Sequence, residues 1–341
     1  MERLQWGDRV QAARWDAFVT AHGEGSFFHL SGWQRLLEEL YGHTSYYLYA
    51  EQAGQIVGVL PLARVTSRLF GDQLVSTPFC VYGGALASSA EVLQALLKTA
   101  RQMAELLDVD HLELRSSQPL DARWVPKPLY ATFRKPIVAD PEANLMAIPR
   151  KQRAEVRRGI KAGLSVTLES DVSGGYAIYA ESLRNLGTPV FPVGHFQTLK
   201  RIFGDGVEMA VVRDGGQPVS SVLSFYYKDQ VLPYYGGARP TGRRVGAYPY
   251  MYYDLMNRAA SRGARVFDFG RSKVGTGAYD FKRFYGFSPE PLHYGYHLVQ
   301  SRQLPDLNPL NPKYQRFIRL WRQLPLPIAN LLGPRLARSL G

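Results

Sequence analysis

"AVVRDGGQPVSSVLSFYY", residues 210–227, consists of two apolar segments separated by Asp214–Gly215–Gly216. An Asp-Gly step between two β-branched segments is a strong signal of a β-hairpin, because glycine readily adopts the left-handed backbone that tight turns need. A second stretch, "YAEQAGQIVGVLPLA" at residues 49–63, has the same form around a turn at Ala53–Gly54. The sequence therefore predicts two β-hairpins of similar design in one chain.

Each hairpin is followed by the same kind of segment. A Tyr-Gly-Gly step comes next, at residues 82–84 and 235–237, and a helical pattern follows it. We expect the first helix to begin at a capping box formed by Ser88 and Glu91, and the second to have Pro249 at its first position. The two halves thus agree in order as well as in content.

Each of these helices leads into one more strand, "HLELRSS" at residues 111–117 and "VFDFGRS" at residues 266–272. A further helix is expected before each hairpin, at residues 31–42 and 173–187. Because these elements recur in one order and at matched spacing, we interpret the chain as a duplicated α/β domain. Hairpin strands, a crossover helix and a further strand then build a mixed sheet in each copy.

Charge and composition narrow the class of protein. Most of the net charge of +12 lies in two segments, a basic helix at residues 150–161 and the tail at residues 301–341. The single cysteine, Cys80, excludes an internal disulfide and a cysteine-built metal site, and it fits a reducing, cytoplasmic compartment. The first residues lack the apolar core of a signal peptide, and no apolar run reaches the ~18 residues of a membrane span, so neither is expected.

These features divide the chain into four expected parts. They are a first domain at 1–149, a basic linker helix at 150–163, a second domain at 164–300 and a basic amphipathic tail at 301–341. In the tail, Asn311 is the expected cap and Pro312 the first residue of a helix whose apolar face contains Tyr314, Phe317, Ile318, Trp321 and Leu324. This helix, at 311–324, suits either an anionic membrane surface, which means the inner face of the membrane, or docking on the protein's own second domain.

The parts of the repeated unit resemble an acyl-CoA N-acyltransferase (GNAT) domain. Two such domains in tandem resemble the Fem (FemABX) family, the aminoacyl-tRNA-dependent peptidyltransferases of peptidoglycan precursors. The segments that carry this resemblance are "RKQRAEVRRGIKAGLSV" (150–166) and "FDFGRSKVGTGAYDFKRFYGF" (267–287). The tail at 307–341 is similar to that of Fem-like proteins associated with exosortase (PEP-CTERM) and exopolysaccharide systems.

The resemblance implies an acyltransferase that moves an acyl or aminoacyl group to an amine of a cell-envelope precursor, either peptidoglycan or exopolysaccharide and in one version lipid-linked. It implies no tightly bound cofactor and a donor that is either aminoacyl-tRNA or acyl-CoA. The donor stays open because residues 243–248 match the coenzyme A loop of the superfamily only in part, with Tyr248 at the place of a small residue. Two alternatives remain, an acyl-CoA-dependent N-acyltransferase acting on an amino sugar and a non-catalytic phosphate-binding or scaffolding module.

Residues 265–287 hold the expected active site. Transfer to an amine requires alignment of amine and carbonyl, a proton acceptor and stabilisation of the oxyanion. Asp268 ends a strand, where the ligand crevice of an α/β sheet usually lies, and Tyr279 is a second acid/base candidate. The resemblance places Phe281 and Lys282 at the donor end, with Lys282 stabilising charge there. Further donor-binding candidates lie in the two glycine-containing loops: Arg271, Lys273, Gly275, Gly277, Arg243 and Gly246.

Each candidate also has a plainer interpretation. Lys282 taken alone is a solvated surface charge, Asp268 a turn cap, Tyr279 a packing residue and residues 270–277 a connecting loop. No metal site is expected, because His293 and His297 fall on a strand-like segment and lie about 13 Å apart there.

The basic helix likewise has two interpretations. Arg153, Arg157 and Lys161 recur at i, i+4 spacing and so share one face of the helix. They form either a site for the phosphates of tRNA or of a diphosphate-linked acceptor, or the wet side of an ordinary linker helix.

Overall fold

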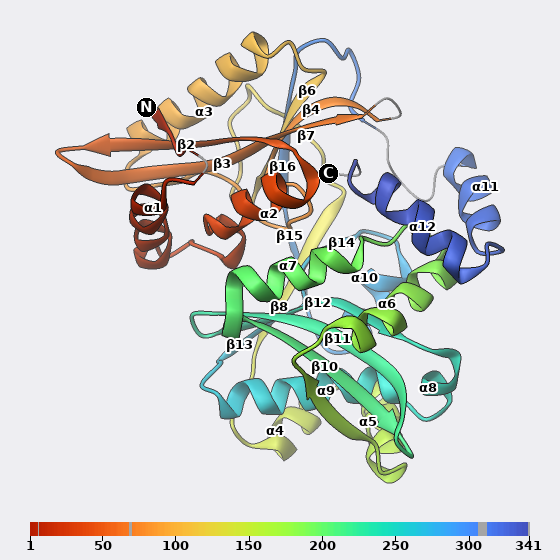
Figure 1. The fold of residues 1–341 in the computed structure, drawn as a ribbon. Helices are drawn as coiled ribbons and strands as arrows, with labels where there is room; N and C mark the ends of the chain where they lie inside the picture. The colour runs from red at the N-terminus through yellow and green to blue at the C-terminus, as the bar shows by residue number, and fades with distance from the viewer. Residues whose placement is uncertain (6, 68–69, 306–311, 340–341) are drawn as a thin grey trace. The chain divides into compact units, whose positions relative to one another are not determined.

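The computed structural model describes residues 1–5, 7–67, 70–305 and 312–339, without the side chains of residues 312–314. It divides the chain into two compact units (Figure 1). Unit 1 comprises Met1–Tyr130, Pro291–Asp306 and Arg338–Gly341, and unit 2 comprises Ala131–Glu290 and Leu307–Ala337.

Unit 1 contains both strands and helices. They are β1 (Glu2–Arg3), α1 (Arg9–Ala21), η1 (Phe27–His29), α2 (Gly32–Tyr41), β2 (Thr44–Gln52), β3 (Gln55–Ser67), β4 (Gly71–Ser76), β5 (Leu86–Ala87), α3 (Ala90–Leu106), β6 (His111–Ser116), β7 (Val125–Pro126) and β16 (His293–Leu298).

Unit 2 has the corresponding elements and several more helices. They are β8 (Tyr130–Pro136), α4 (Pro141–Met146), α5 (Arg150–Lys161), β9 (Ser165–Glu169), α6 (Ser173–Leu186), α7 (Val193–Phe203), η2 (Gly204–Gly206), β10 (Val207–Asp214), β11 (Gln217–Tyr227), β12 (Gln230–Ala238), α8 (Pro240–Arg244), α9 (Ala247–Ser261), β13 (Val266–Asp268), β14 (Ser272–Lys273), α10 (Gly277–Phe284), β15 (Pro289–Pro291), α11 (Pro312–Trp321) and α12 (Leu326–Ala337).

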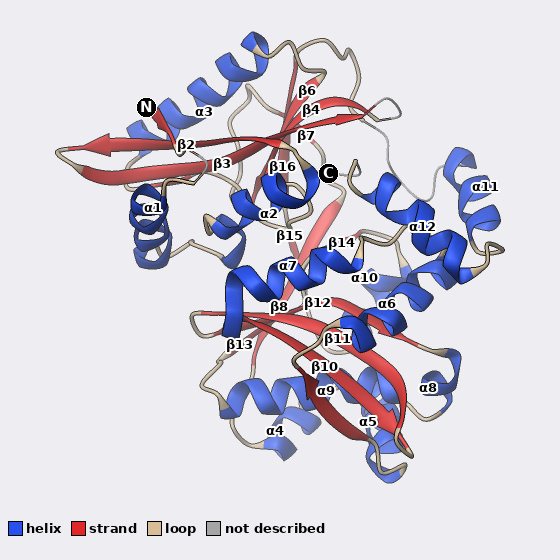
Figure 2. Ribbon diagram, viewed as in Figure 1, coloured by secondary structure: helices blue, strands red, loops and turns tan. Residues whose placement is uncertain are grey.

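The two units contain sheets of the same topology, as the strands in Figure 2 show. The strand order is β1-β2-β3-β4-β6-β16-β7 in unit 1 and β9-β10-β11-β12-β13-β8-β14 in unit 2. In both sheets the hairpin strands are antiparallel, and the strands before and after the crossover helix, β4 with β6 and β12 with β13, are parallel. The predicted α/β fold with a duplicated domain is confirmed.

Each sheet is completed by a strand from the other half of the sequence. β16 pairs antiparallel with β6 in unit 1, and β8 pairs antiparallel with β13 in unit 2. The expected boundary at residue 149 therefore falls inside unit 2, and residues 291–300, expected in the second domain, belong to unit 1. The physical reason is that β6 and β13 each have a second edge whose backbone N–H and C=O groups need a partner, and the alternation along a strand does not say which sheet it will join.

Helices cover both faces of the sheet in unit 2. Successive side chains of a strand point to opposite faces. On β11, Ser220 Oγ donates to the carbonyl of Ala247 on α9 at 3.4 Å, whereas Ser221 Oγ donates to the carbonyl of Gly175 on α6 at 2.7 Å. The helices α6 and α9 therefore lie on opposite faces, as Figure 1 shows.

Unit 1 has the same three-layer arrangement. On β2, the ring of Tyr47 packs against Trp15 of α1, with ring centroids 5.1 Å apart, while the neighbouring Leu48 belongs to the core cluster that Leu96 and Leu97 of α3 complete. Because Tyr47 and Leu48 are adjacent on the strand, α1 and α3 cover opposite faces of this sheet.

The helix starts differ slightly from those expected. α3 is capped by Ser89, whose Oγ accepts from the backbone N–H of Val92 at 3.3 Å, and not by Ser88. α9 begins at Ala247 after Gly246, which has a φ of +73°, so Pro249 is its third residue and not its first. The cap Asn311 and the side chain of Tyr314, expected in the tail, lie outside the part of the chain that the structure describes.

No helix among the described residues combines the length and the apolar character needed to cross a bilayer.

Candidate active site

The site predicted from the sequence lies in unit 2, where two parallel strands separate. β12 and β13 pair only through Gln230 with Val266 and Val231 with Phe267. β12 then continues to Ala238, while β13 ends at Asp268. The backbone after Asp268 therefore leaves β12 but stays bonded to β8, since the N–H of Phe269 donates to the carbonyl of Phe133 at 2.8 Å. It turns at residues 268–270, where the Asp268 side chain accepts from the N–H of Gly270.

Asp268 is a buried carboxylate that organises this turn. Its side chain Oδ1 accepts from the backbone N–H of Gly270 at 2.7 Å and from the hydroxyl of Thr132 at 3.5 Å. Gly270 adopts a φ of +64°, a conformation that favours glycine. Asp268 thus caps the turn, which is the plainer of its two expected roles, and it does so at the end of β13.

Lys282 is almost fully buried, with 9% of its surface exposed. Its Nζ donates to the carbonyls of Phe269, Gly270 and Arg271 at 2.6, 2.9 and 3.0 Å. An ammonium has three donors, and these contacts use all of them. Lys282 is therefore not a solvated surface charge, and in this conformation it has no donor left for a substrate oxyanion.

Burial lowers the pKa of Lys282 from 10.5 to about 7. The nearby carboxylate of Asp268 opposes this shift and the guanidinium of Arg271 reinforces it. A lysine whose pKa lies near neutral pH can gain and lose a proton under physiological conditions, and such perturbed groups concentrate at functional sites.

Phe281 belongs to an aromatic cluster between α9 and α10. Its ring centroid lies 5.3 Å from that of Tyr248 and 5.9 Å from that of Tyr252. The hydroxyl of Tyr252 donates to that of Tyr248 at 2.9 Å. Tyr248, which stands where the coenzyme A loop has a small residue, thus has a defined packing partner in this protein.

The loop before α9 is less open than a phosphate-binding loop. A Cβ built at Gly246 would collide with the carbonyl oxygen of Glu155 on α5, so glycine is required there by packing. Arg243 lies on α8 and is exposed. The two candidates from this loop are therefore close in sequence, but only Arg243 faces solvent.

The segment expected as a mobile glycine loop contains regular structure. Arg271 and Lys273 flank the buried Ser272 at β14, and both are half-buried. Gly275 has a φ of +78°, and Gly277 is the first residue of α10.

Tyr279 of α10 has the packing role that was its plainer interpretation. Its ring lies edge-on to that of Phe133, with centroids 5.3 Å apart. Its backbone N–H donates at 3.4 Å to the hydroxyl of Thr276, the N-cap of the helix.

The predicted phosphate patch on α5 is only partly available. The guanidinium of Arg153 donates to the carbonyls of Ile148 and Met146 at 3.0 and 3.2 Å, which fixes the turn before the helix. Arg157 lies 4.0 Å from the carboxylate of Glu142, and Lys161 is exposed.

Two residues near Lys282 were not predicted from the sequence. Thr132 and Phe133 lie on β8, and the ring centroid of Phe133 is 5.3 Å from Lys282 Nζ. The sequence analysis predicts no strand at residues 130–133, so the place of Thr132 and Phe133 beside Asp268 follows only from the pairing of β8 with β13.

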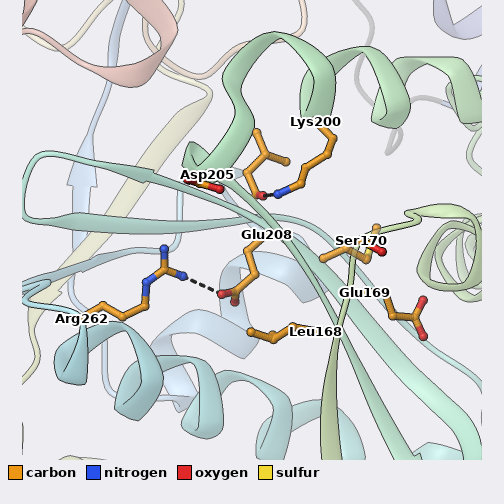
Figure 3. Close-up of a pocket in the computed structure, with 9 residues that line it drawn as sticks. Leu168, Glu169, Ser170, Lys200, Asp205, Glu208 and Arg262 are labelled. Atoms are coloured by element: carbon orange, nitrogen blue, oxygen red, sulfur yellow. Dashed lines mark hydrogen bonds and ion pairs between the residues drawn. The ribbon is translucent and has the colours of Figure 1, made fainter.

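A separate pocket in unit 2 has a volume of about 280 Å³ and is lined by β9, β10 and the ends of α7 and α9 (Figure 3). Its basic groups are bonded within the protein, since Arg262 donates to Glu208 at 2.7 Å and Lys200 to the carbonyl of Val207 at 2.8 Å. None of the described residues that line it belongs to the predicted site.

Comparisons with known proteins agree with this architecture. Residues 150–283 match the family described as acetyltransferase (GNAT) domain. No curated protein sequence matches the chain. Among solved structures, FemX superposes with a TM-score of 0.66 at 16% identity, over 93% of this chain and 100% of that one.

Two other structures share the fold. The C-terminal domain of a putative lysylphosphatidylglycerol synthetase from Agrobacterium fabrum has a TM-score of 0.58 at 12% identity and covers 84% of this chain and 91% of its own. A tandem GNAT protein from the clavulanic acid biosynthesis pathway has a TM-score of 0.56 at 11% identity, with 88% and 98% covered. Residues 150–283 of unit 2 thus match a GNAT acetyltransferase domain, and the chain as a whole shares its fold with FemX and with a tandem GNAT protein.

Proposed function

We propose that this protein transfers an acyl or aminoacyl group to an amine of a cell-envelope precursor, and that Lys282 is its central residue. The observation that carries the proposal is the buried amine of Lys282, with a pKa of about 7, held at the end of β13 beside Asp268. The position is the end of a strand in a GNAT domain, the place where ligands of open α/β sheets bind.

The reaction moves one proton that a lysine of this kind is suited to handle. The amine nitrogen attacks the carbonyl carbon of a donor ester or thioester, a C–N bond forms, and the C–O or C–S bond breaks. The amine loses a proton, which neutral Lys282 accepts and returns to the leaving oxygen or sulfur. The carbonyls of residues 269–271 hold the ammonium that exists between these two steps.

Solved structures with a similar fold support an acceptor in the cell envelope. They include FemX and a putative lysylphosphatidylglycerol synthetase, whose name is that of an enzyme making an aminoacylated lipid. We infer an acceptor among peptidoglycan or exopolysaccharide precursors, free or lipid-linked, and a reaction in the cytoplasm. Aminoacyl-tRNA is the favoured donor, because Gly246 is packed against α5 and Tyr248 fills the place of a small residue.

A second candidate function is transfer from acyl-CoA to an amino sugar. The match of residues 150–283 to the GNAT domain favours it, since proteins of this fold commonly use acyl-CoA. Calorimetric titration with coenzyme A separates the two candidates, because binding in the micromolar range supports the acyl-CoA donor and its absence supports aminoacyl-tRNA.

The test of the proposal compares turnover in the wild type, Lys282→Met and Arg283→Met. Arg283 is the exposed neighbour of Lys282 on α10 and serves as the matched control. With radiolabelled aminoacyl-tRNA or acyl-CoA and a panel of amine acceptors, we expect Lys282→Met to lower kcat by about 100-fold or more and Arg283→Met to leave it nearly unchanged.

A second measurement keeps the test independent of folding. The kcat of the wild type should rise with pH and level off above about 7, as the neutral form of Lys282 accumulates. Near-normal turnover in Lys282→Met contradicts the role of this residue. A wild type that turns over neither donor with any acceptor supports the scaffolding alternative.

A further inference from the structure

The last two helices, α11 and α12, carry charge of one sign only. Residues 312–341 contain six arginine and lysine residues and no aspartate or glutamate. The arginines whose side chains are described, Arg316, Arg319, Arg322, Arg335 and Arg338, are all exposed.

Both helices dock on unit 2 through a limited set of contacts. On α11, Trp321 is buried and Ile318 packs so closely on Gly187 that a Cβ there would lie 2.8 Å from the carbonyl oxygen of Ile318. Arg322 donates to the carbonyl of Leu186, the last residue of α6, at 3.3 Å. The alternative that the tail docks on the second unit is therefore confirmed for this part of α11.

On α12 the small residues face the protein. Ala329, Gly333 and Ala337 are buried at i, i+4 spacing, and a Cβ built at Gly333 would lie 3.0 Å from the backbone of Val190. This stripe lets α12 approach the segment after α6 closely, as its position beside α6 in Figure 1 shows.

Several large apolar side chains of these helices are exposed to solvent. Ile328, Leu331 and Leu332 occupy i, i+3 and i+4 positions on the opposite face of α12, and Leu331 is 63% exposed. On α11, Leu320 is 67% exposed and lies one turn from the partly exposed Phe317. A surface helix of a globular protein normally buries its leucines, so this arrangement is reversed. We call Phe317, Leu320, Ile328, Leu331 and Leu332 the tail face.

The charges around the tail face select one kind of partner. A second copy of the chain would bring arginines against arginines without a carboxylate between them, and like charges at an interface are repulsive. An anionic lipid surface satisfies both features, because leucines enter the boundary between head groups and acyl chains while arginines reach the phosphates.

We propose that the tail face binds the surface of an anionic bilayer, with Leu320 and Leu331 as its deepest side chains. The contact differs from the one expected at 311–324, because Trp321 is turned into the protein and α12 supplies most of the apolar surface. The inference concerns where the protein binds and does not depend on the proposed reaction.

The experiment uses the full chain and vesicles of phosphatidylcholine, with or without a quarter of phosphatidylglycerol, in co-sedimentation at low and moderate salt. The test variant is Leu320→Gln/Leu331→Gln. The matched control is Val10→Gln/Leu106→Gln, which removes apolar residues that are 73% and 87% exposed on α1 and α3. We expect binding of the wild type and the control to anionic vesicles, and at least about tenfold weaker binding of the test variant.

A third variant examines the charge. Arg316→Gln/Arg319→Gln keeps the leucines and should bind anionic vesicles more weakly than the wild type. The binding that remains should also depend less on the salt concentration. All four proteins should unfold at similar temperatures, because exposed substitutions rarely change stability by more than about 0.5 kcal/mol.

Three outcomes overturn the proposal. The first is equal vesicle binding by the test and control variants, and the second is binding that ignores the charge of the lipid. The third is a wild type that light scattering shows to be a dimer and a Leu320→Gln/Leu331→Gln variant that is a monomer, which assigns the tail face to self-association.

Discussion

Lys282 is held by the backbone of the segment that follows β13. Its ammonium donates to three consecutive carbonyls, and the carboxylate of Asp268 acts on it through space. The resemblance of the Phe281–Lys282 pair to the family motif predicts that Lys282 belongs to the active site. Without that resemblance, a single lysine at this position predicts only a solvated surface charge. The burial of Lys282 could not be predicted, because Thr132 and Phe133, which lie beside it and Asp268, come from a strand about 150 residues earlier. The sequence does not assign that strand to this sheet.

The burial of Lys282 makes stability depend on pH. The folded protein holds this lysine with a pKa of about 7, whereas the unfolded chain has a value near 10.5. Between these values the unfolded state binds more protons, so the free energy of unfolding rises with pH, by at most about 1.4 kcal/mol per pH unit from this group.

Urea unfolding of the wild type and Lys282→Met from pH 6 to pH 9 measures this contribution. The difference in unfolding free energy between the two proteins should be constant below pH 7 and should shift in favour of the wild type above it. A difference that does not change over this range means that the lysine is not desolvated in the folded state.

Local signals predicted the elements well, and side-chain packing decided the rest. The turns at Ala53–Gly54 and at residues 214–216 give the expected hairpins, and α5 has the bounds of the predicted basic helix. Several of the described helices were not predicted, among them α7 and α10. In α10 the glycines at 275 and 277 indicated a loop, but they stand before and at the start of the helix, where Thr276 supplies the cap.

The helix α7 contains a buried histidine that titrates far from its usual range. Burial lowers the pKa of His195 from 6.5 to about 3. Its Nε2 lies 2.9 Å from the hydroxyl of Tyr235 on β12, and its ring stacks on Phe191 with centroids 4.6 Å apart. The contact of α7 with the sheet therefore depends on a neutral imidazole.

Acid should weaken this contact before it affects most of the molecule. Between pH 6.5 and 3 the unfolded chain protonates His195 and the folded one does not, so the free energy of unfolding falls as the pH falls. His195→Gln keeps a hydrogen-bonding group but cannot titrate. We expect its unfolding free energy to decline less steeply than that of the wild type in denaturant titrations between pH 6.5 and pH 4, and parallel curves for the two proteins would count against the buried neutral form.

At the scale of the whole molecule, the sequence predicts that an α/β domain is duplicated. It does not predict that each of the two sheets is completed by a strand from the other half of the chain. The order of elements is local information, and it repeats. Nearby sequence does not say which strand will pair with the open edge of a sheet. β8 and β16 are ordinary strand patterns, and the alternation of their side chains would allow each to pair with either sheet. The domain boundary at 149 followed from sequence order alone, which is why it cuts through unit 2.

Because β16 completes the sheet of unit 1 and β8 that of unit 2, the structure predicts which fragments of the chain can fold. A protein ending at residue 149 lacks β16, so β6 loses an antiparallel partner along its whole length, from His111 to Ser116. It also loses the buried rings of Tyr294 and Tyr296, and Tyr296 donates to the buried carboxylate of Glu113 at 2.8 Å. Removing one buried aromatic side chain costs about 3–5 kcal/mol, which for two such residues exceeds the reserve of many small domains.

A fusion of residues 1–130 to residues 291–306 restores what the shorter fragment lacks. A short glycine linker suffices, because the backbone N–H of Leu292 donates to the carbonyl of Tyr130 at 3.0 Å and the two ends are already adjacent. Residues 338–341 are absent from both proteins, so their contribution cancels in the comparison. We expect the fusion to unfold cooperatively in urea with a near-ultraviolet circular dichroism signal from its buried tyrosines, and the 1–149 fragment to show neither. If the 1–149 fragment unfolds as cooperatively as the fusion, then β16 is dispensable to unit 1 and the strand exchange has no role in its stability.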